Sequence, residues 1–187
     1  MAKENSKRER LVAAADKLFH EQGIINTTLA NIAELAEVPL GNVYYYFKSK
    51  DSIILAVIEG RKKQLESLFT QCEQVETIKE RLNAFVQYDQ QVAETSAKFG
   101  DSLGSLCQEL GKQGGTIAQA ASSLMQRVLQ WCDQQFQALG KTPEEASQLS
   151  LSLVSSIQGI NLITLTFNDP NYLNQHGQYL NHWIEKL

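Results

Sequence analysis

Proline is rare in this chain of 187 residues, and its three positions constrain the fold more than any other feature. Pro39, Pro143 and Pro170 each stand where a helix could begin, which is the place in a helix where a missing backbone N–H costs nothing. The segments between them repeat apolar residues with the period of an amphipathic helix. The sequence therefore predicts an all-α protein of about nine helices.

The first four predicted helices are marked by their ends. An apolar stripe predicts a first helix that ends near Gly23: Leu11, Ala14, Ala15, Leu18 and Phe19. Thr28 offers an N-cap hydroxyl to a second helix of about two turns. A third segment runs from Pro39 to Phe47, and Ser49 is expected to cap a long fourth helix that bridges the two halves.

Composition and charge limit the classes of partner. The net charge is −4, but residues 1–64 carry +2 and the remainder carries −6, so the N-terminal third is the part expected to face an anion. The N-terminus lacks an apolar targeting segment, and Ser and Gln interrupt the uncharged stretch between Glu145 and Asp169. We therefore expect a cytoplasmic protein with a buried helix in that stretch and no membrane span.

The sequence offers little for catalysis or for a bound metal. Cys72, Cys107 and Cys132 form no CxxC pair, which argues against a disulfide framework and a structural zinc site. The three histidines are isolated, and no glycine-rich phosphate loop or spaced nucleophile and base occurs. We expect neither an enzyme nor a cofactor.

Two short helices joined by a tight turn, the second rich in tyrosine and followed by lysine, are typical of a helix-turn-helix. The stretch from Thr27 to Ala33 and the stretch from Val38 to Lys50, with its Tyr-Tyr-Tyr-Phe-Lys-Ser-Lys end, resemble the DNA-binding region of the TetR/AcrR family of repressors. The resemblance covers residues 8–58. Beyond them, only length and helix layout agree.

The resemblance implies DNA contacts at eight positions, which are Thr28, Ala30, Leu40, Gly41, Asn42, Tyr44, Tyr45 and Lys50. Thr28, Tyr45 and Lys50 would hold phosphates, and Tyr44 would do likewise or touch a base. Ala30 and the three residues from Leu40 to Asn42 would lie at base-reading positions, where the amide of Asn42 suits adenine.

The alternative interpretation of the same segment is that some of its side chains pack inside the protein and do not contact DNA. Consecutive helical residues fan out by about 100°, so three successive tyrosines cannot all face DNA, and we expect Tyr46 to be partly structural. Val43 and Phe47 are expected in the core. The Lys7–Arg10 run is expected to be a solvated helix start and not a DNA arm.

We expect two domains, a DNA-binding domain over residues 1–50 and a helical ligand-binding and dimerisation domain over residues 51–187. A two-fold dimer doubles the contacts that one helix-turn-helix can make with DNA. The last two predicted helices are the candidate interface, because they combine small residues such as Ser155 and Gly159 with a row of apolar ones. Leu153, Ile157, Leu165, Tyr172, Leu173, Tyr179, Leu180 and Trp183 belong to that row.

The resemblance also implies an apolar pocket for an inducer. The segments expected to surround it contribute Phe85, Tyr88, Leu103, Cys107, Met125, Trp131, Gln158 and Asn161. The mixture suits a largely apolar ligand with one or two polar groups. The sequence thus predicts a homodimeric repressor that a small inducer releases from a palindromic operator. The alternative is an architectural or division-linked DNA-binding factor without a ligand.

Overall fold

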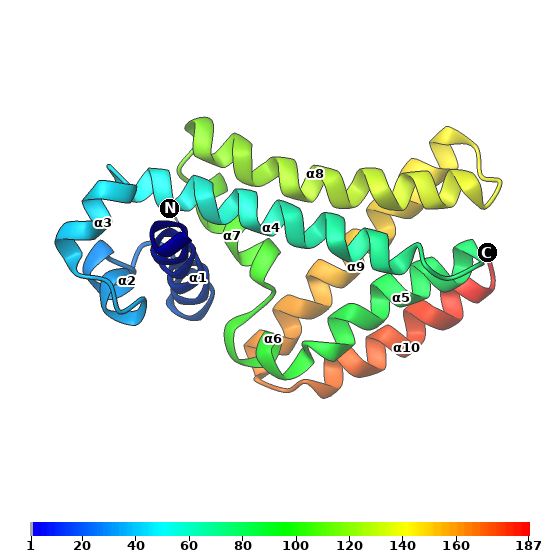
Figure 1. The fold of residues 1–187 in the computed structure, drawn as a ribbon. Coiled ribbons are helices and arrows are strands. Elements are labelled where there is room, and N and C mark those ends of the chain that lie inside the picture. Colours follow the sequence, from blue (N-terminus) through cyan, green and yellow to red (C-terminus); the bar gives the residue numbers. More distant parts are fainter. Residues whose placement is uncertain (1) are drawn as a thin grey trace. The chain divides into compact units, whose positions relative to one another are not determined.

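The computed structural model describes residues 2–187, with side chains from Lys7 onward, and these described residues form helices and no strand (Figure 1). The helices are α1 (Ala2–Gln22), α2 (Leu29–Leu35), α3 (Leu40–Tyr46), α4 (Lys50–Cys72), α5 (Ile78–Gln91), α6 (Ala93–Phe99), α7 (Ser102–Gly111), α8 (Gly115–Ala138), α9 (Pro143–Phe167) and α10 (Asn171–Glu185). The prediction of an all-α fold is confirmed. The short helix α6 is the element that the apolar pattern did not reveal.

The chain packs as two compact units. Unit 1 contains the chain up to Lys63 together with Ser105–Leu124, and unit 2 contains Gln64–Gly104 and Met125–Leu187. The predicted bridge, α4, does run from one unit into the other, and so do α7 and α8. The units are defined by which parts of the chain pack together, and this does not test a division by function. The domain boundary expected between residues 50 and 51 therefore stays a prediction.

Unit 1 includes α1, α2 and α3, which pack against one another (Figure 1). Leu11, Ile32 and Val43 are fully excluded from solvent and form the centre of this packing. The buried guanidinium of Arg61, on α4, donates from Nε to Oδ1 of Asp16 on α1 at 2.6 Å. This ion pair fixes α4 against α1, because losing the carboxylate would leave a buried cation without its main counter-charge.

Threonine begins several of the helices; the starts at Thr28 and Pro143 were predicted, and the one at Thr77 was not. Thr28, Thr77 and Thr142 each form a capping box, in which the hydroxyl accepts from the third residue of the helix and that residue's side chain bonds back. Ser49 Oγ accepts from the N–H of Ser52 at 3.2 Å and caps α4 as predicted. Pro39 differs from Pro143, because it is the N-cap of α3 in an extended conformation and not the first helical residue.

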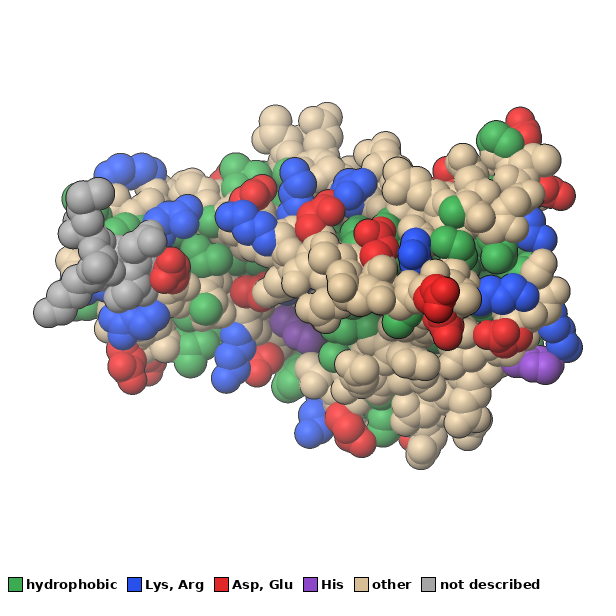
Figure 2. All heavy atoms as spheres, turned by 45° about the vertical axis from the view of Figure 1, so that its right-hand side comes forward, with side chains coloured by type: hydrophobic (Ala, Val, Ile, Leu, Met, Phe, Trp, Pro, Cys, Tyr) green, Lys and Arg blue, Asp and Glu red, His purple; other side chains and the backbone are tan. Residues whose placement is uncertain are grey.

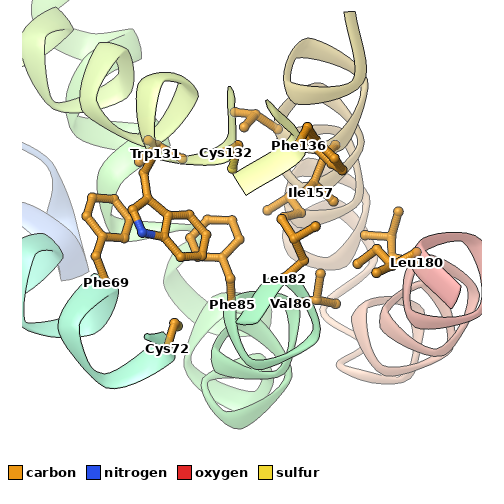
Figure 3. Close-up of a cluster of buried hydrophobic side chains, with 14 of the residues drawn as sticks. Phe69, Cys72, Leu82, Phe85, Val86, Trp131, Cys132, Phe136, Ile157 and Leu180 are labelled. Atoms are coloured by element: carbon orange, nitrogen blue, oxygen red, sulfur yellow. The ribbon is translucent and has the colours of Figure 1, made fainter. Parts of the chain in front are cut away.

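The core of unit 2 contains three aromatic rings in contact (Figure 3). Phe69 stacks on Trp131 with ring centroids 5.0 Å apart, and Phe85 leans against Trp131 at 5.3 Å. The indole Nε1 of Trp131 donates to Oε1 of Glu73 at 2.8 Å, so its one polar atom has a partner. The rings tie α4, α5 and α8 together.

Helix α9 has two different faces. Its buried face contains Leu153, Val154 and Ile157, whereas Leu151 and Leu162 on the other face are more than half exposed. By length and composition, α9 is the one helix of the described residues that could cross a membrane, and a third of its most apolar window is buried. A core helix of a soluble protein meets the same criterion, so α9 is weak evidence for a span.

Candidate functional site

The segment from α2 to α3 forms two short helices joined by a tight turn. The helix α2 ends at Leu35, and Glu37 adopts a left-handed conformation with φ of 53° before Val38 re-enters the core. Thr28 begins α2 with its hydroxyl on the N–H of Asn31 at 3.1 Å. The described geometry is that of a helix-turn-helix, with α3 as its second helix.

The predicted DNA-contacting residues lie mainly on the surface. Thr28, Ala30 and Gly41 are exposed, as are Leu40, Tyr44 and Tyr45, and Asn42 is half-buried. Nothing lies within 4 Å of the position that a Cβ would take at Gly41, so the helix presents open backbone there. This placement is compatible with the predicted contacts and leaves each of them a prediction.

The packing residues of α3 are as the sequence predicts. Val43 is fully buried and Phe47 is 3% exposed, so both belong to the core. Tyr46 is half-buried and meets the ring of Tyr45 edge to face, with centroids 5.0 Å apart. The most exposed of the three tyrosines is therefore Tyr45, and Tyr46 supports it.

Two cationic side chains that contact α3 or the residue after it, Arg8 and Lys48, are not among the predicted DNA-contacting residues. The guanidinium of Arg8 lies 5.2 Å from the ring centroid of Phe47, which is the distance of a cation–π contact. Lys48 Nζ donates to the carbonyl oxygen of Tyr44 at 3.1 Å, near the C-terminal end of α3. Arg8 belongs to the charged run at residues 7–10, which is expected to be a solvated helix start, and its side chain is exposed. Nothing near Arg8 in the sequence indicates its contact with Phe47.

Lys50 has partners within unit 1. Its Nζ donates to the carbonyl oxygen of Ile24, in the turn between α1 and α2. Burial lowers the pKa of Lys50, while the carboxylates of Glu109 and Asp51 act in the opposite direction. In this structure Lys50 binds the turn between α1 and α2, and its contact with a DNA phosphate stays a prediction.

Charges of both signs cover the face of the molecule in Figure 2, with Lys and Arg interspersed among Asp and Glu. Attraction for an anion must therefore be local, as expected for a chain of net charge −4.

Seven of the eight predicted ligand residues fall in unit 2, and Cys107 falls in unit 1, where its Sγ contacts the carbonyl oxygen of Ala121 at 3.3 Å. Four of the seven meet in one cluster, because Phe85 and Trp131 are core residues and Leu103 and Met125 pack against that core. Tyr88 is 45% exposed. Phe69, which stacks on Trp131, is absent from the predicted ligand-binding residues.

The two predicted amides, Gln158 and Asn161, belong to a polar group that also contains two aspartates. Gln158 Nε2 donates to Oδ2 of Asp101 at 3.0 Å, and the N–H of Gly104 donates to the same oxygen at 2.6 Å. Burial and the charge of Asp101 raise the pKa of Asp89 to about 8, against a hydrogen bond from Asn161 that lowers it. Oδ1 of Asn161 is buried without a hydrogen-bond partner. A cavity of about 10 Å³, space for one water at most, borders Asp89 and His176.

No cluster of three or more His, Cys, Asp or Glu side chains suited to a metal ion occurs in the described part of the chain.

Apart from Tyr88 on α5, the large exposed apolar side chains of unit 2 lie on α9 and α10. They are Leu151, Leu162, Ile163, Leu165, Phe167, Tyr172 and Tyr179. The structure corrects part of the predicted interface, because Leu153, Ile157, Leu173 and Leu180 are buried within the chain and cannot reach a partner. On a helix of 3.6 residues per turn, Leu151, Ser155, Gly159 and Leu162 fall on one face, opposite the buried one.

Comparisons of sequence support the description of the N-terminal part. Residues 11–57 match the family model described as bacterial regulatory proteins, tetR family. The HTH-type transcriptional regulator TtgR of Pseudomonas putida is 38% identical over 53 residues, which are 28% of this chain and 25% of TtgR. An uncharacterised HTH-type transcriptional regulator of Mycobacterium tuberculosis is 26% identical over 188 residues, covering 96% of this chain and 95% of that protein. Three regulators that match with 38 to 42% identity, TtgR among them, are each covered over only about a quarter of their own length.

Solved structures agree over almost the whole chain. A TetR transcriptional regulator from Legionella pneumophila has a TM-score of 0.84 at 18% identity, covering 95% of both chains. The regulator FadR of Bacillus subtilis, in complex with stearoyl-CoA, has a TM-score of 0.66 at 19% identity and covers 92% of this chain and 96% of its own. At these identities the likeness establishes the fold of both units.

Proposed function

We propose that this chain, a member of the TetR family of transcriptional regulators and not an enzyme, acts in the cytoplasm as a homodimeric repressor. A small, largely apolar inducer would release it from a palindromic operator. The observation that carries the DNA-binding part is the exposed face of α3, where Leu40, Tyr44 and Tyr45 project beyond a buried Val43. Large side chains exposed together on so short a helix are typical of a surface that binds a partner.

Phosphate anchoring and base reading are divided between different residues in this proposal. Tyr45 ends in a hydroxyl, which holds a phosphate in any sequence, whereas Asn42 has the bidentate amide that distinguishes adenine. Replacing the first should weaken binding to every duplex, and replacing the second should change which duplex is preferred.

The test uses an operator duplex that the wild-type protein selects from a random pool, and a scrambled duplex of the same composition. Tyr45→Phe should weaken binding to both duplexes, and Asn42→Ala should reduce only the preference for the operator. Tyr88→Phe, assayed without any inducer, is the matched control, because it removes the same atom from an exposed tyrosine of α5. If Tyr45→Phe and Asn42→Ala both bind like the wild-type protein, α3 is not the recognition helix.

We propose that α9 supplies much of the dimer interface. Nothing lies within 4 Å of a Cβ built at Gly159, so the backbone of a second copy can approach α9 closely between Leu151 and Leu162. Covering this face would also remove its exposed apolar side chains from water. A second copy covers the same residues on both sides of a two-fold axis.

Leu162→Glu should convert the dimer to a monomer and weaken operator binding, because two half-sites are then bound independently. Light scattering after size-exclusion chromatography measures the mass. Gln87→Glu places the same charge on an exposed position of α5 and should leave the dimer intact. A dimer of unchanged stability in Leu162→Glu would contradict this interface.

The inducer is proposed to bind in unit 2, where Phe85, Leu103 and Trp131 lie at or against one core and Gln158 adds a polar group bonded to Asp101. The carboxylates and amides suit a ligand with hydrogen-bond donors at one end of an apolar body. In this proposal, binding changes the packing of unit 2, and that change reaches the DNA-binding helices. The stearoyl-CoA complex of the similar FadR supports an apolar ligand of some length.

A thermal-shift screen of hydrophobic drugs, acyl compounds and quinones, followed by DNA-release assays, tests the inducer. At least one compound that raises the melting temperature should also lower operator affinity. Genomic footprinting separates the alternative function, because one or a few palindromic sites favour a repressor and many dispersed sites favour an architectural factor. If no stabilising compound releases DNA, the inducer model fails while DNA binding stands.

A further inference from the structure

A carboxylate from a distant part of the sequence holds the turn between α1 and α2. Glu109, on α7, accepts a hydrogen bond from the backbone N–H of Ile24 at 2.9 Å and another from that of Ile25 at 2.7 Å. The two bonds go to different oxygens, so the carboxylate faces both amides at once. All three residues belong to unit 1.

The turn is shaped to receive this carboxylate. Gly23 ends α1 with φ of 83°, a conformation that aims the next two N–H groups outward together. A Cβ at Gly23 would lie 3.3 Å from Oε2 of Glu109, so a side chain there would crowd the carboxylate as well as strain the backbone. Thr27, fully buried, closes the turn through its hydroxyl on the carbonyl oxygen of Gly23 at 2.7 Å.

The same turn holds Lys50. The carbonyl oxygen of Ile24 accepts from Lys50 Nζ while the N–H of Ile24 bonds to Glu109, so one residue receives both side chains. The negative charge of Glu109 also stabilises the ammonium of Lys50, whose surroundings are partly buried. Thus α7, the turn and the first residue of α4 meet at Ile24, four residues before the N-cap Thr28.

We propose that Glu109 is a positioning residue for DNA binding, an inference that rests on the DNA-binding function proposed above. Its carboxylate holds the turn so that the N-terminus of α2 and the start of α4 are already in place when DNA arrives. A preformed surface avoids the ordering cost that a loose turn would add on binding. The positioning of the turn by Glu109 favours DNA binding, whereas its negative charge disfavours it, because a carboxylate near the DNA-binding helices repels phosphates.

Because positioning and charge change the DNA affinity in opposite directions, substitutions of Glu109 can separate them. The test uses the selected operator duplex and a scrambled duplex. Glu109→Gln removes the charge and keeps the shape, and Glu109→Asp keeps the charge but is one methylene shorter. Both should bind the operator about tenfold more weakly, because the turn would then be ordered only when DNA binds and that cost would reduce the affinity. Glu109→Asp should also bind the scrambled duplex more weakly, because the phosphate contacts predicted for Thr28 and Lys50 do not depend on sequence. Glu94→Gln, an exposed acid of α6, is the control for loss of charge and should bind like wild type.

Operator binding by Glu109→Gln that equals or exceeds that of the wild-type protein would overturn the proposal. A parallel measurement needs only the wild-type protein, and it decides the matter even if the variants fail to fold. Amide hydrogen exchange should show Ile24 and Ile25 protected in the free protein and in the operator complex. Fast exchange of these two amides in the complex would mean that the contact is absent from the DNA-bound state, and it too would overturn the proposal.

Discussion

Replacing Asp89 by asparagine should change how the stability of the protein depends on pH. The pKa of Asp89 is raised from 3.8 to about 8 by burial and by the nearby charge of Asp101. A carboxyl whose pKa is higher in the folded state binds its proton more tightly there. The folded state therefore loses stability as the pH rises from about 4 to about 8, by up to about 1.4 kcal/mol for each pH unit. The asparagine variant has no such loss.

The magnitude follows from that slope. Between pH 5 and pH 8, Asp89→Asn should gain about 2 to 4 kcal/mol in free energy of unfolding relative to the wild-type protein. His176, which borders the same cavity as Asp89, has its pKa lowered by burial and contributes in the opposite direction, as stability that is lost below pH 6.5. Because both proteins contain His176, their difference isolates Asp89.

Urea unfolding followed by circular dichroism at pH 5, 6, 7 and 8 measures this difference. Glu94→Gln removes an exposed carboxylate from the same unit and should give a curve parallel to that of the wild-type protein. Parallel curves for Asp89→Asn would refute the argument, because they would mean that Asp89 titrates as it does in the unfolded chain.

Two further substitutions test the packing. Trp131→Phe should lower the free energy of unfolding by about 1 to 3 kcal/mol, because Glu73 loses the indole N–H and the stack on Phe69 shrinks; urea unfolding at pH 7 measures it, and an unchanged midpoint and slope would contradict the packing of this core. Glu37→Gly should raise the free energy of unfolding by up to about 1 kcal/mol, because glycine adopts the left-handed conformation without the strain of a Cβ; a lower melting temperature in calorimetry would show that the Glu37 side chain contributes more than its backbone costs.

The parts of the fold that the sequence predicts are those with local causes. Thr142, Pro143 and Glu145 lie within four consecutive residues, so their capping box and the start of α9 can be read directly from the sequence. Burial of Val43 and exposure of Tyr45 follow from helical period alone. The same period could not say which apolar residues of α9 and α10 face inward, because both faces of α9 are apolar.

The parts that the sequence does not predict depend on residues far apart in the chain. Glu109 binds amides 84 and 85 positions earlier, and nothing near Glu109 or Ile24 marks the pair. The rise in the pKa of Asp89 likewise requires that Asp89 is buried and that Asp101 comes close. Such contacts are fixed only when whole helices pack, so one sequence without its structure leaves them open.

The shape of α3 limits how the operator can be read. The helix has seven residues, of which Val43 faces the core and Tyr46 supports Tyr45, so few side chains remain for bases. Among the others, the tyrosine hydroxyls suit phosphates, Leu40 can contact only a thymine methyl, and Asn42 alone has a bidentate amide. Direct contacts of this kind give about 1 to 3 kcal/mol each, too little for a full operator preference from one or two of them. In the proposed dimer, discrimination must then come mostly from the spacing of two half-sites and from the deformability of the DNA. Operator base pairs that the protein does not touch should therefore affect its affinity, and the carboxylate of Glu109, which holds the turn before α2, can matter as much for affinity as a residue that meets a base.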